Sequence, residues 1–219
     1  MIQKSYTKQF ITLFFVLAMV FLVSIGLGSV AIPIDEIIAV LLGNNSSKSS
    51  WSTIILHFRL PKAITAMLVG SGLSIAGLLM QTLFKNPLAG PFVLGISSGA
   101  SLGVAILILG AGIFGGVLTT ISLSSWGLAI ASSIGAALVL FAVLITANKV
   151  RNTMSILIIG LMFGTVTSAI ISVFTFFSNA DKIQQFVFWG FGSLGNLSWN
   201  EILIFFTIYL IAIINLIGI

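Results

Sequence analysis

The sequence predicts an all-α fold, a polytopic bundle of transmembrane helices, and two observations carry that prediction. Of its 219 residues, 58% are hydrophobic and only 6% are charged, with a mean hydropathy of +1.25. A soluble domain carries about 25% charged residues, so lipid is the solvent for most of this chain. Its apolar runs, such as Ala66–Met80, do not alternate polar and apolar residues as the strands of a membrane β-barrel do. Helices then remain as the structure in which every backbone N–H and C=O group can find a hydrogen-bond partner within a bilayer.

Six apolar runs approach the length of about 20 helical residues that crossing a bilayer takes. In chain order they are Phe10–Ile32, Ala63–Phe84, Phe92–Ile113, Trp126–Ala147, Met154–Phe177 and Ile202–Ile219. The first run follows Lys4 and Lys8 in the manner of a signal peptide, but it is longer than the roughly 7–15 residues of a signal core. We therefore expect it to be retained as the first span. The small and polar segment Gly115–Ser125 separates the third and fourth spans.

The composition excludes several kinds of site. The chain has no cysteine and a single histidine, His57, which removes disulfides, thiolate chemistry and a histidine-based metal centre within these residues. Its nine Lys and Arg residues are scattered singly, so membrane topology explains the net charge of +5 better than nucleic-acid binding does. No catalytic cluster lies at a plausible depth, and we expect no cofactor. The sequence therefore points away from an enzyme.

None of the six spans contains Asp, Glu, Lys, Arg or His. Charged residues inside a membrane usually mark proton relays or ion sites, so their absence disfavours a proton-coupled carrier. Two interpretations stay open. The helices are passive anchors, or they form a transport pathway whose driving force comes from another protein.

The loop charges predict the orientation of the chain. With the N-terminus in the cytoplasm, the basic residues inside are Lys4, Lys8, Lys85, Lys149 and Arg151. Those outside are Lys48, Arg59, Lys62 and Lys182, together with all four acids, Asp35, Glu36, Asp181 and Glu201. The short turns at 84–91 and 148–153 are basic without acids, which the positive-inside rule assigns to the cytoplasm.

The segment between the second and third spans predicts a tight reversal followed by a small-residue face. Asn86-Pro87 favours a turn, because the residue before proline is pushed out of the α region. Pro91 falls at or just before the first turn of the next helix, where its missing N–H costs nothing. A GxxxGxxxG pattern follows at Gly95, Gly99 and Gly103. Such faces allow helices to approach closely in lipid, and each of these glycines either packs or lines a pathway.

The segment Phe58–Gly103 closely resembles the signature region of the FecCD-type ABC transporter permeases. That family shows R-L-P-R, a small-residue helix ending in Q, and then N-P-L-A-x-P-x-x-L-G-x-x-x-G-A. The matching residues here are Arg59-Leu60-Pro61-Lys62, Gln81, Asn86, Pro87, Leu88, Ala89, Pro91, Leu94, Gly95, Gly99 and Ala100. A later segment, Phe188–Trp199, resembles the family's W-x-x-G-S-L segment that ends in Trp.

The resemblance implies a bacterial inner-membrane subunit of an importer for iron complexes (ferric siderophore or haem) or cobalamin. Such a permease has about ten helices and pairs with a second permease copy, with substrate passing inward along the dimer interface. An extracytoplasmic substrate-binding protein delivers the substrate, and cytoplasmic ATP-binding subunits supply the energy. This chain would then form a single permease domain over residues 1–219, and its spans would need no charge of their own.

The resemblance also implies roles for particular residues. Arg59 and Lys62 match the two basic positions of R-L-P-R, which receive acidic residues of the binding protein; anchoring of the second helix at the interface is the alternative. At Lys62 this chain has a lysine where the family usually has an arginine. Lysine keeps the positive charge but lacks the bidentate geometry of a guanidinium. The residues expected along the translocation path are Gly160, Gly164, Ser168, Trp189 and Gly192. Helix packing is the alternative for the small residues, and a membrane-belt position is the alternative for Trp189.

The chain ends at Ile219, just before the point where the family carries a coupling helix with an L-G-E-x-A-like motif. We therefore expect an N-terminal fragment, and ATPase binding only by a longer parent chain. An ion-coupled secondary transporter or channel remains as an alternative, with a sodium site among Ser97, Ser98 and Ser101. A non-transporting membrane scaffold is a third.

Overall fold

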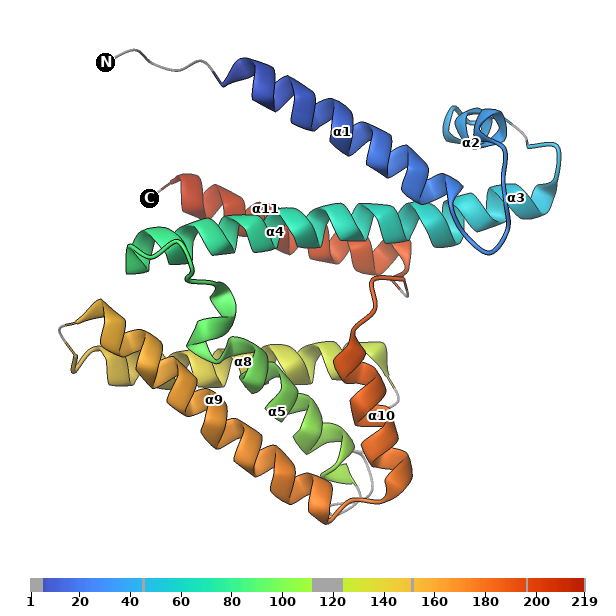
Figure 1. Ribbon diagram of the computed structural model, residues 1–219. Helices are drawn as coiled ribbons and strands as arrows, with labels where there is room; N and C mark the ends of the chain where they lie inside the picture. Colours follow the sequence, from blue (N-terminus) through green and yellow to red (C-terminus); the bar gives the residue numbers. More distant parts are fainter. Residues whose placement is uncertain (1–5, 45, 112–123, 151, 196, 219) are drawn as a thin grey trace. The chain divides into compact units, whose positions relative to one another are not determined.

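The computed structural model describes residues 6–44, 46–111, 124–150, 152–195 and 197–218, and all of these lie in helices and their connections (Figure 1). This confirms the all-α class. Lys4, Arg151 and residues 115–123 of the expected loop lie outside the described residues. The chain divides into two compact units. Unit 1 comprises Met1–Gly72 and Ser193–Ile219, and unit 2 comprises Leu73–Gly192.

Five helices are long and apolar enough to cross a membrane, within the residues that the structure describes. They are Thr7–Gly26, Ser49–Phe84, Ser125–Ala147, Met154–Phe176 and Trp199–Ile217. Each overlaps one of the predicted spans, and the chain is a multi-pass membrane protein. The remaining predicted span, the third, is represented by the shorter apolar helix Ile96–Ile108.

Unit 1 is built from two long helices and the first part of a third, with short helices between. Its elements are α1 (Thr7–Gly26), α2 (Ile34–Leu41), α3 (Ser49–Ile54), the π-helix η1 (Ile55–Arg59), the part of α4 (Leu60–Phe84) that ends at Gly72, and α11 (Trp199–Ile217). Buried residues of α1, α2, η1, α4 and the connection between α1 and α2 form one apolar cluster, which consists of Ile25, Ile32, Ile37, Val40, Ile55 and Ala63. α11 runs beside the first part of α4 (Figure 1).

Two predicted boundaries in unit 1 are wrong. The first span was expected to reach Ile32, but α1 ends at Gly26, because residues 27–33 turn to enter the amphipathic helix α2. The second span was expected to begin at Ala63, but α3, η1 and α4 form one continuous helix from Ser49. His57 and Arg59 therefore lie within a helix and not in a loop.

Unit 2 holds the end of α4 and then η2 (Pro91–Leu94), α5 (Ile96–Ile108), α8 (Ser125–Ala147), α9 (Thr153–Phe176) and α10 (Ala180–Phe191). α5 packs on both α8 and α9 (Figure 1). One buried cluster joins the reversal after α4 to α8, through Phe84, Ala89, Leu94, Val139 and Val143. A second lies along the end of α5, through Val104, Ala105, Ile108 and Leu109.

The third predicted span, Phe92–Ile113, is wrong as a single helix. The chain makes a short 3-10 helix, turns at Gly95 and only then starts α5, while Ile113 lies outside the described residues. The helix α10 was not predicted, because residues 180–191 were assigned to the connection between the fifth and sixth spans. Its mixture of Asp, Lys, Gln and aromatic residues hid a helix that packs one face and exposes the other.

Candidate functional site

The signature segment begins with a helix C-cap at the end of α4. The Lys85 N–H donates to the Thr82 carbonyl at 3.3 Å, and the Asn86 N–H donates to the Gln81 carbonyl at 3.1 Å. These are the two bonds of a Schellman motif, which requires a left-handed residue at its turning position. Lys85 supplies it, with a φ of +48°, and is the single non-glycine residue with positive φ in the part of the chain that the structure describes. Gln81 takes part in this cap through its backbone carbonyl, and its side chain is exposed.

Asn86 and Pro87 then form a turn that buries Ala89. The Asn86 side chain accepts a hydrogen bond from the Leu88 N–H at 2.9 Å, and its carbonyl accepts one from the Ala89 N–H at 3.1 Å. Proline suits the second position of such a turn and asparagine the first. Ala89 enters the apolar cluster while Leu88 stays exposed. The predicted reversal is confirmed.

Gly95 connects the two helical pieces after the turn. Pro91 opens η2 at its first position, as predicted, and Gly95 follows η2 with a φ of +72°. A Cβ at Gly95 would also lie 2.9 Å from the Gly160 carbonyl oxygen of α9. Glycine is needed here both for the left-handed backbone and for the contact with α9. Gly95 is therefore a joint before α5 and not part of a continuous α5 face, which corrects the GxxxGxxxG interpretation.

The other two glycines of that pattern pack against α8. A Cβ at Gly99 would lie 2.6 Å from the Gly135 carbonyl oxygen, and one at Gly103 would lie 2.1 Å from the Ala131 carbonyl oxygen. The approach is reciprocal, since a Cβ at Gly135 would lie 2.2 Å from the Gly99 carbonyl oxygen. In this structure Gly99 and Gly103 serve helix packing.

The small residues of α9 divide between packing and a hollow. A Cβ at Gly160 would lie 2.4 Å from the Val93 carbonyl oxygen, so Gly160 packs against η2. At Gly164 the nearest atom is the Ser98 hydroxyl oxygen, 3.4 Å away, which leaves ordinary van der Waals room. A partly polar notch of about 330 Å³ opens there; its lining residues are Phe92, Val93, Gly95, Ser98, Gly160, Leu161, Gly164, Thr165 and Ser168.

Trp189 and Gly192 lie away from this notch. Trp189 is on α10, where its half-buried ring stacks on Phe186 at 6.4 Å between centroids and packs against the end of α5. Gly192 ends α10 with a φ of +70°, and no atom of the described residues lies within 4 Å of a Cβ placed there. The structure therefore brings Gly160, Gly164 and Ser168 together but not Trp189 or Gly192 with them.

In unit 1, Arg59 reaches from η1 to the end of α1. Its Nη1 donates to the carbonyls of Ile25 and Gly26 at 2.8 and 2.9 Å, and its Nη2 donates to the Val30 carbonyl. The last carbonyls of a helix have no partner within the helix and carry the negative end of its dipole. The guanidinium therefore caps α1 and ties the following loop to η1.

Lys62 lies one turn further on, at the rim of a cavity. Its side chain is exposed and lines a space of about 430 Å³ together with Arg59, Phe58, Gly28 and Gly195, among others. The Lys62 Cδ lies 3.8 Å from where a Gly195 Cβ would be, so the alkyl stem runs past this glycine. Gly195 belongs to the resembling G-S-L-G segment, and the sequence alone gave no reason for its position.

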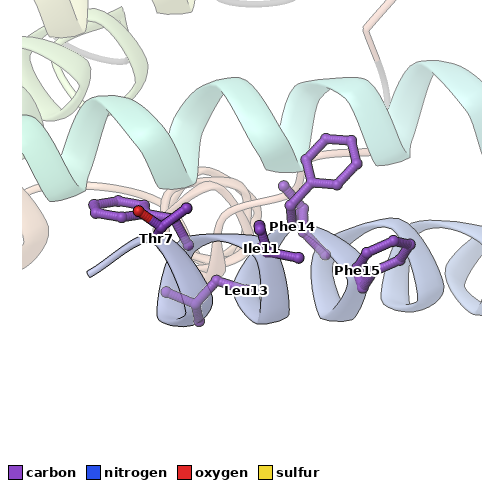
Figure 2. Close-up of a pocket in the computed structure, with 7 residues that line it drawn as sticks. Thr7, Ile11, Leu13, Phe14 and Phe15 are labelled. Carbon is purple, nitrogen blue, oxygen red and sulfur yellow. The ribbon is translucent and has the colours of Figure 1, made fainter. Parts of the chain in front are cut away.

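A hollow of about 610 Å³ along α1 carries no site. Seven residues of that single helix line it, from Thr7 to Leu17, and Figure 2 shows the labelled side chains projecting from the one helix. Phe14 and Phe15 are each 67% exposed. A hollow walled by one helix cannot enclose a ligand, and such exposed aromatic side chains suit contact with lipid.

Comparison with known proteins places the signature in its family. The model of the FecCD transport family matches residues 16–219. The chain belongs to the FecCD transport family. The match extends over residues of both units, and the FecCD signature residues described above supply the reversal after α4 and the cap of α1.

Curated relatives and a solved structure agree with this assignment. The vitamin B12 import system permease protein BtuC of Klebsiella pneumoniae is 34% identical over 149 residues, 68% of this chain and 42% of that protein. A probable iron chelatin transport system permease protein of Helicobacter pylori is 40% identical over 164 residues, 74% of this chain and 46% of that protein. A solved metal-chelate type ABC transporter in an inward-facing conformation superposes with a TM-score of 0.76 at 26% identity, covering 94% of this chain and 60% of that one. The chain thus spans less than half the length of the two curated relatives.

Two contributors to unit 1 were not predicted. Gly28 lies against the guanidinium, since a Cβ there would be 2.6 Å from Arg59 Nη2. Trp199, noted only as the last residue of a motif, donates its indole N–H to the Leu56 carbonyl of η1 at 3.0 Å. No local sequence signal pairs residues this far apart.

Proposed function

We propose that this FecCD family chain is the membrane-spanning permease subunit of an ABC importer, and that it forms one permease domain. Its substrates would be iron complexes, such as a ferric siderophore or haem, or cobalamin. The support is the signature from Arg59 to Gly99, together with the family match and the identity to relatives named for vitamin B12 and iron chelatin transport. Energy would come from cytoplasmic ATP-binding subunits, which fits the absence of charged residues from the six apolar runs of the sequence.

We propose the partners and the orientation on the same basis. A second permease copy would complete the path, an extracytoplasmic substrate-binding protein would dock near Arg59 and Lys62, and the bilayer would surround α1. In the bacterial inner membrane the N-terminus would face the cytoplasm. Because the chain has no cysteine, Lys8→Cys and Lys62→Cys variants report the orientation directly: an impermeant thiol reagent added outside intact cells should label only Lys62→Cys. Labelling of Lys8→Cys alone would reverse the orientation.

The translocation path would follow the notch on α9. Gly164 and Ser168 would border it, Gly160 would hold α9 against η2, and Trp189 and Gly192 would act further along through α10. The notch offers hydroxyls and main-chain atoms without charge, which suits passage of a large polar complex without tight binding.

Uptake by reconstituted vesicles tests the proposal. The permease is reconstituted with its ATP-binding subunits and its substrate-binding protein, and uptake of cobalamin and of a ferric siderophore is measured with and without ATP. We expect uptake of one of them that requires both ATP and the binding protein. Uptake driven by a sodium gradient without ATP would favour the ion-coupled alternative, for which Ser98 on the notch is the first candidate ligand. No uptake under any energisation would favour a scaffold.

A further inference from the structure

An apolar groove of about 430 Å³ lies between α1 and the first part of α4. α1 lines the groove with one face, through residues spaced by three and four positions from Leu17 to Ser24. α4 contributes small residues, among them Ala63, Ala66 and Gly70, and no atom of the described residues lies within 4 Å of a Cβ at Gly70. The two helices are close near the end of α1 and separate toward its start (Figure 1). The groove therefore opens sideways, toward the surroundings of the two helices.

The groove meets the cavity beside Lys62. Ser24 lines both spaces, and Lys62 of the cavity directly precedes Ala63 of the groove. Two cations, Arg59 and Lys62, line the cavity, and none of the described residues that line it is acidic. An apolar space thus leads into a positively charged one within the same unit.

The charge and the hydroxyls of this cavity are available to a ligand. Arg59 donates to main-chain carbonyls, which carry no net charge, so its positive charge is not neutralised. The side chains of Lys62, Ser24 and Ser29 make no hydrogen bond or ion pair within the part of the chain that the structure describes. One ammonium and two hydroxyls are the donors that a phosphate group accepts. The cavity therefore favours an anion with several acceptor oxygens.

The position of the cavity along α4 corresponds to the headgroup level of a membrane. The apolar run Ala63–Phe84 rises about 33 Å as a helix, enough to cross a hydrocarbon core of about 30 Å, and Lys62 comes directly before it. The groove follows α4 from Ala63 to Ser71, which is about 12 Å at 1.5 Å per residue. That length approaches the depth of one leaflet, about 15 Å. A lipid with its headgroup at Lys62 would place an acyl chain along the groove.

We infer that the groove and the cavity form a binding site for one anionic phospholipid. The phosphate contacts Lys62 and the hydroxyls of Ser24 and Ser29, and an acyl chain lies between α1 and α4. A headgroup without an amine, as in phosphatidylglycerol, suits a cavity that already holds two cations, and basic pockets between membrane helices bind such headgroups. The inference rests on the membrane-spanning helices and not on the substrate or energy source of transport. In the proposed orientation the lipid belongs to the outer leaflet.

Photolabelling tests the site. Phosphatidylglycerol with a photoreactive group on one acyl chain is added to the purified protein in micelles, and the labelled residues are mapped by mass spectrometry. We expect label to concentrate on residues 17–24 and 63–71, and to fall with excess unlabelled phosphatidylglycerol but not with phosphatidylcholine. Label spread evenly around α1 would show only the general lipid surroundings and would overturn the inference. So would equal competition by soluble glycerol phosphate, which would assign the cavity to a free phosphate ester.

The headgroup contact is tested at Lys62, whose exposed side chain can be changed without disturbing a packed contact. Lys62→Gln should weaken phosphatidylglycerol binding about fivefold, the effect expected of one lysine at an anionic surface. Lys62→Arg keeps the charge and should bind like the wild-type protein. Equal affinities of Lys62→Gln and the wild-type protein would contradict the phosphate contact.

The acyl-chain contact is tested by filling the groove. Gly70 and Gly77 are both glycines of α4 with no described atom within 4 Å of an added Cβ, but only Gly70 lines the groove. Gly70→Leu should remove the label from residues 63–71, whereas the matched control Gly77→Leu should keep it. Ser24→Leu fills the groove from α1 and replaces Gly70→Leu if that variant does not fold. Undiminished label in the filled variants would reject the groove as the acyl-chain site, whether or not the wild-type protein transports.

Discussion

In unit 2 the main chains of neighbouring helices approach each other at glycines, whereas in unit 1 side chains reach across to partners on other helices. Gly99 and Gly135 interlock in unit 2, and no side chain lies between them. In unit 1, Arg59 binds the end of α1, Trp199 binds Leu56, and the Tyr209 hydroxyl donates to the Ser71 hydroxyl at 2.8 Å.

Main-chain contacts at glycines and hydrogen bonds from side chains both serve to hold helices together in a membrane. Lipid provides no hydrophobic force between helices, so close packing and interhelical hydrogen bonds have to hold them. Close packing depends on space at a few glycines and tolerates no added atom. Hydrogen bonding depends on a few donors and acceptors and is lost one bond at a time. Unit 2 should therefore be sensitive to the smallest insertions, and unit 1 to the removal of single polar groups.

The largest effect should follow from Gly135→Ala. The new methyl group would lie 2.2 Å from the Gly99 carbonyl oxygen and 2.8 Å from the Gly103 amide nitrogen, and neither is a side chain that can rotate away. We expect a loss of about 3 kcal/mol or more of unfolding free energy, at the upper end of overpacking costs. Denaturant titration in mixed micelles measures it.

Gly77→Ala is the matched control, since no atom of the part of the chain that the structure describes lies within 4 Å of a Cβ at Gly77 of α4. Alanine favours a helix interior over glycine by up to about 1 kcal/mol, so this variant should be neutral or more stable. Equal losses in the two variants would break the distinction between packed and open glycines.

A smaller effect, of opposite sign, is expected from Lys85→Gly. The left-handed conformation costs a lysine about 1–2 kcal/mol of conformational free energy, whereas a glycine adopts it at almost no cost. We expect a gain of about 1 kcal/mol in unfolding free energy, measured in the same titration. Lys85→Ala removes the charge and keeps the Cβ, so a similar gain from it would show that charge, and not backbone conformation, is responsible.

The smallest effect should come from unit 1. The coupling between Tyr209→Phe and Ser71→Ala in a double-mutant cycle should be about 0.6 kcal/mol, as for other hydrogen bonds between membrane helices. Tyr209 also packs against Gly72, where a Cβ would lie 3.4 Å from its ring. Gly72→Ala should therefore add a cost that is independent of the hydroxyl. A coupling indistinguishable from zero would remove this bond from the contacts that hold unit 1.

The sequence predicted the parts of this fold that local chemistry determines. Apolar length located five spans, and Asn86, Pro87 and Pro91 predicted the reversal between α4 and η2, because turn residues act on their own backbone. The joint at Gly95 was missed, since a glycine's sequence position does not show whether its φ is positive. The sequence therefore also gave no sign that α5 begins only after Gly95 and is shorter than the predicted span.

Contacts between distant residues could not be predicted in this way. For Arg59 the sequence predicted docking of a binding protein or anchoring of the second helix, and it gave no sign that the guanidinium donates to carbonyls more than 25 residues away. Gly160 and Gly164 are both glycines of α9. Gly160 is packed because the backbone of η2 lies against it, whereas Gly164 has only the Ser98 hydroxyl near it, at van der Waals distance. Such distinctions depend on which helices become neighbours.

Transport along the notch of α9 is tested most directly by a Gly164→Cys variant in this cysteine-free chain. A Cβ fits at this position, since among the described residues only the Ser98 hydroxyl oxygen lies within 4 Å of it, at 3.4 Å. We expect ATP-dependent uptake to persist before thiol modification and to fall by more than half after a bulky thiol reagent has reacted. Complete modification of the cysteine with uptake unchanged would contradict a translocation path along α9.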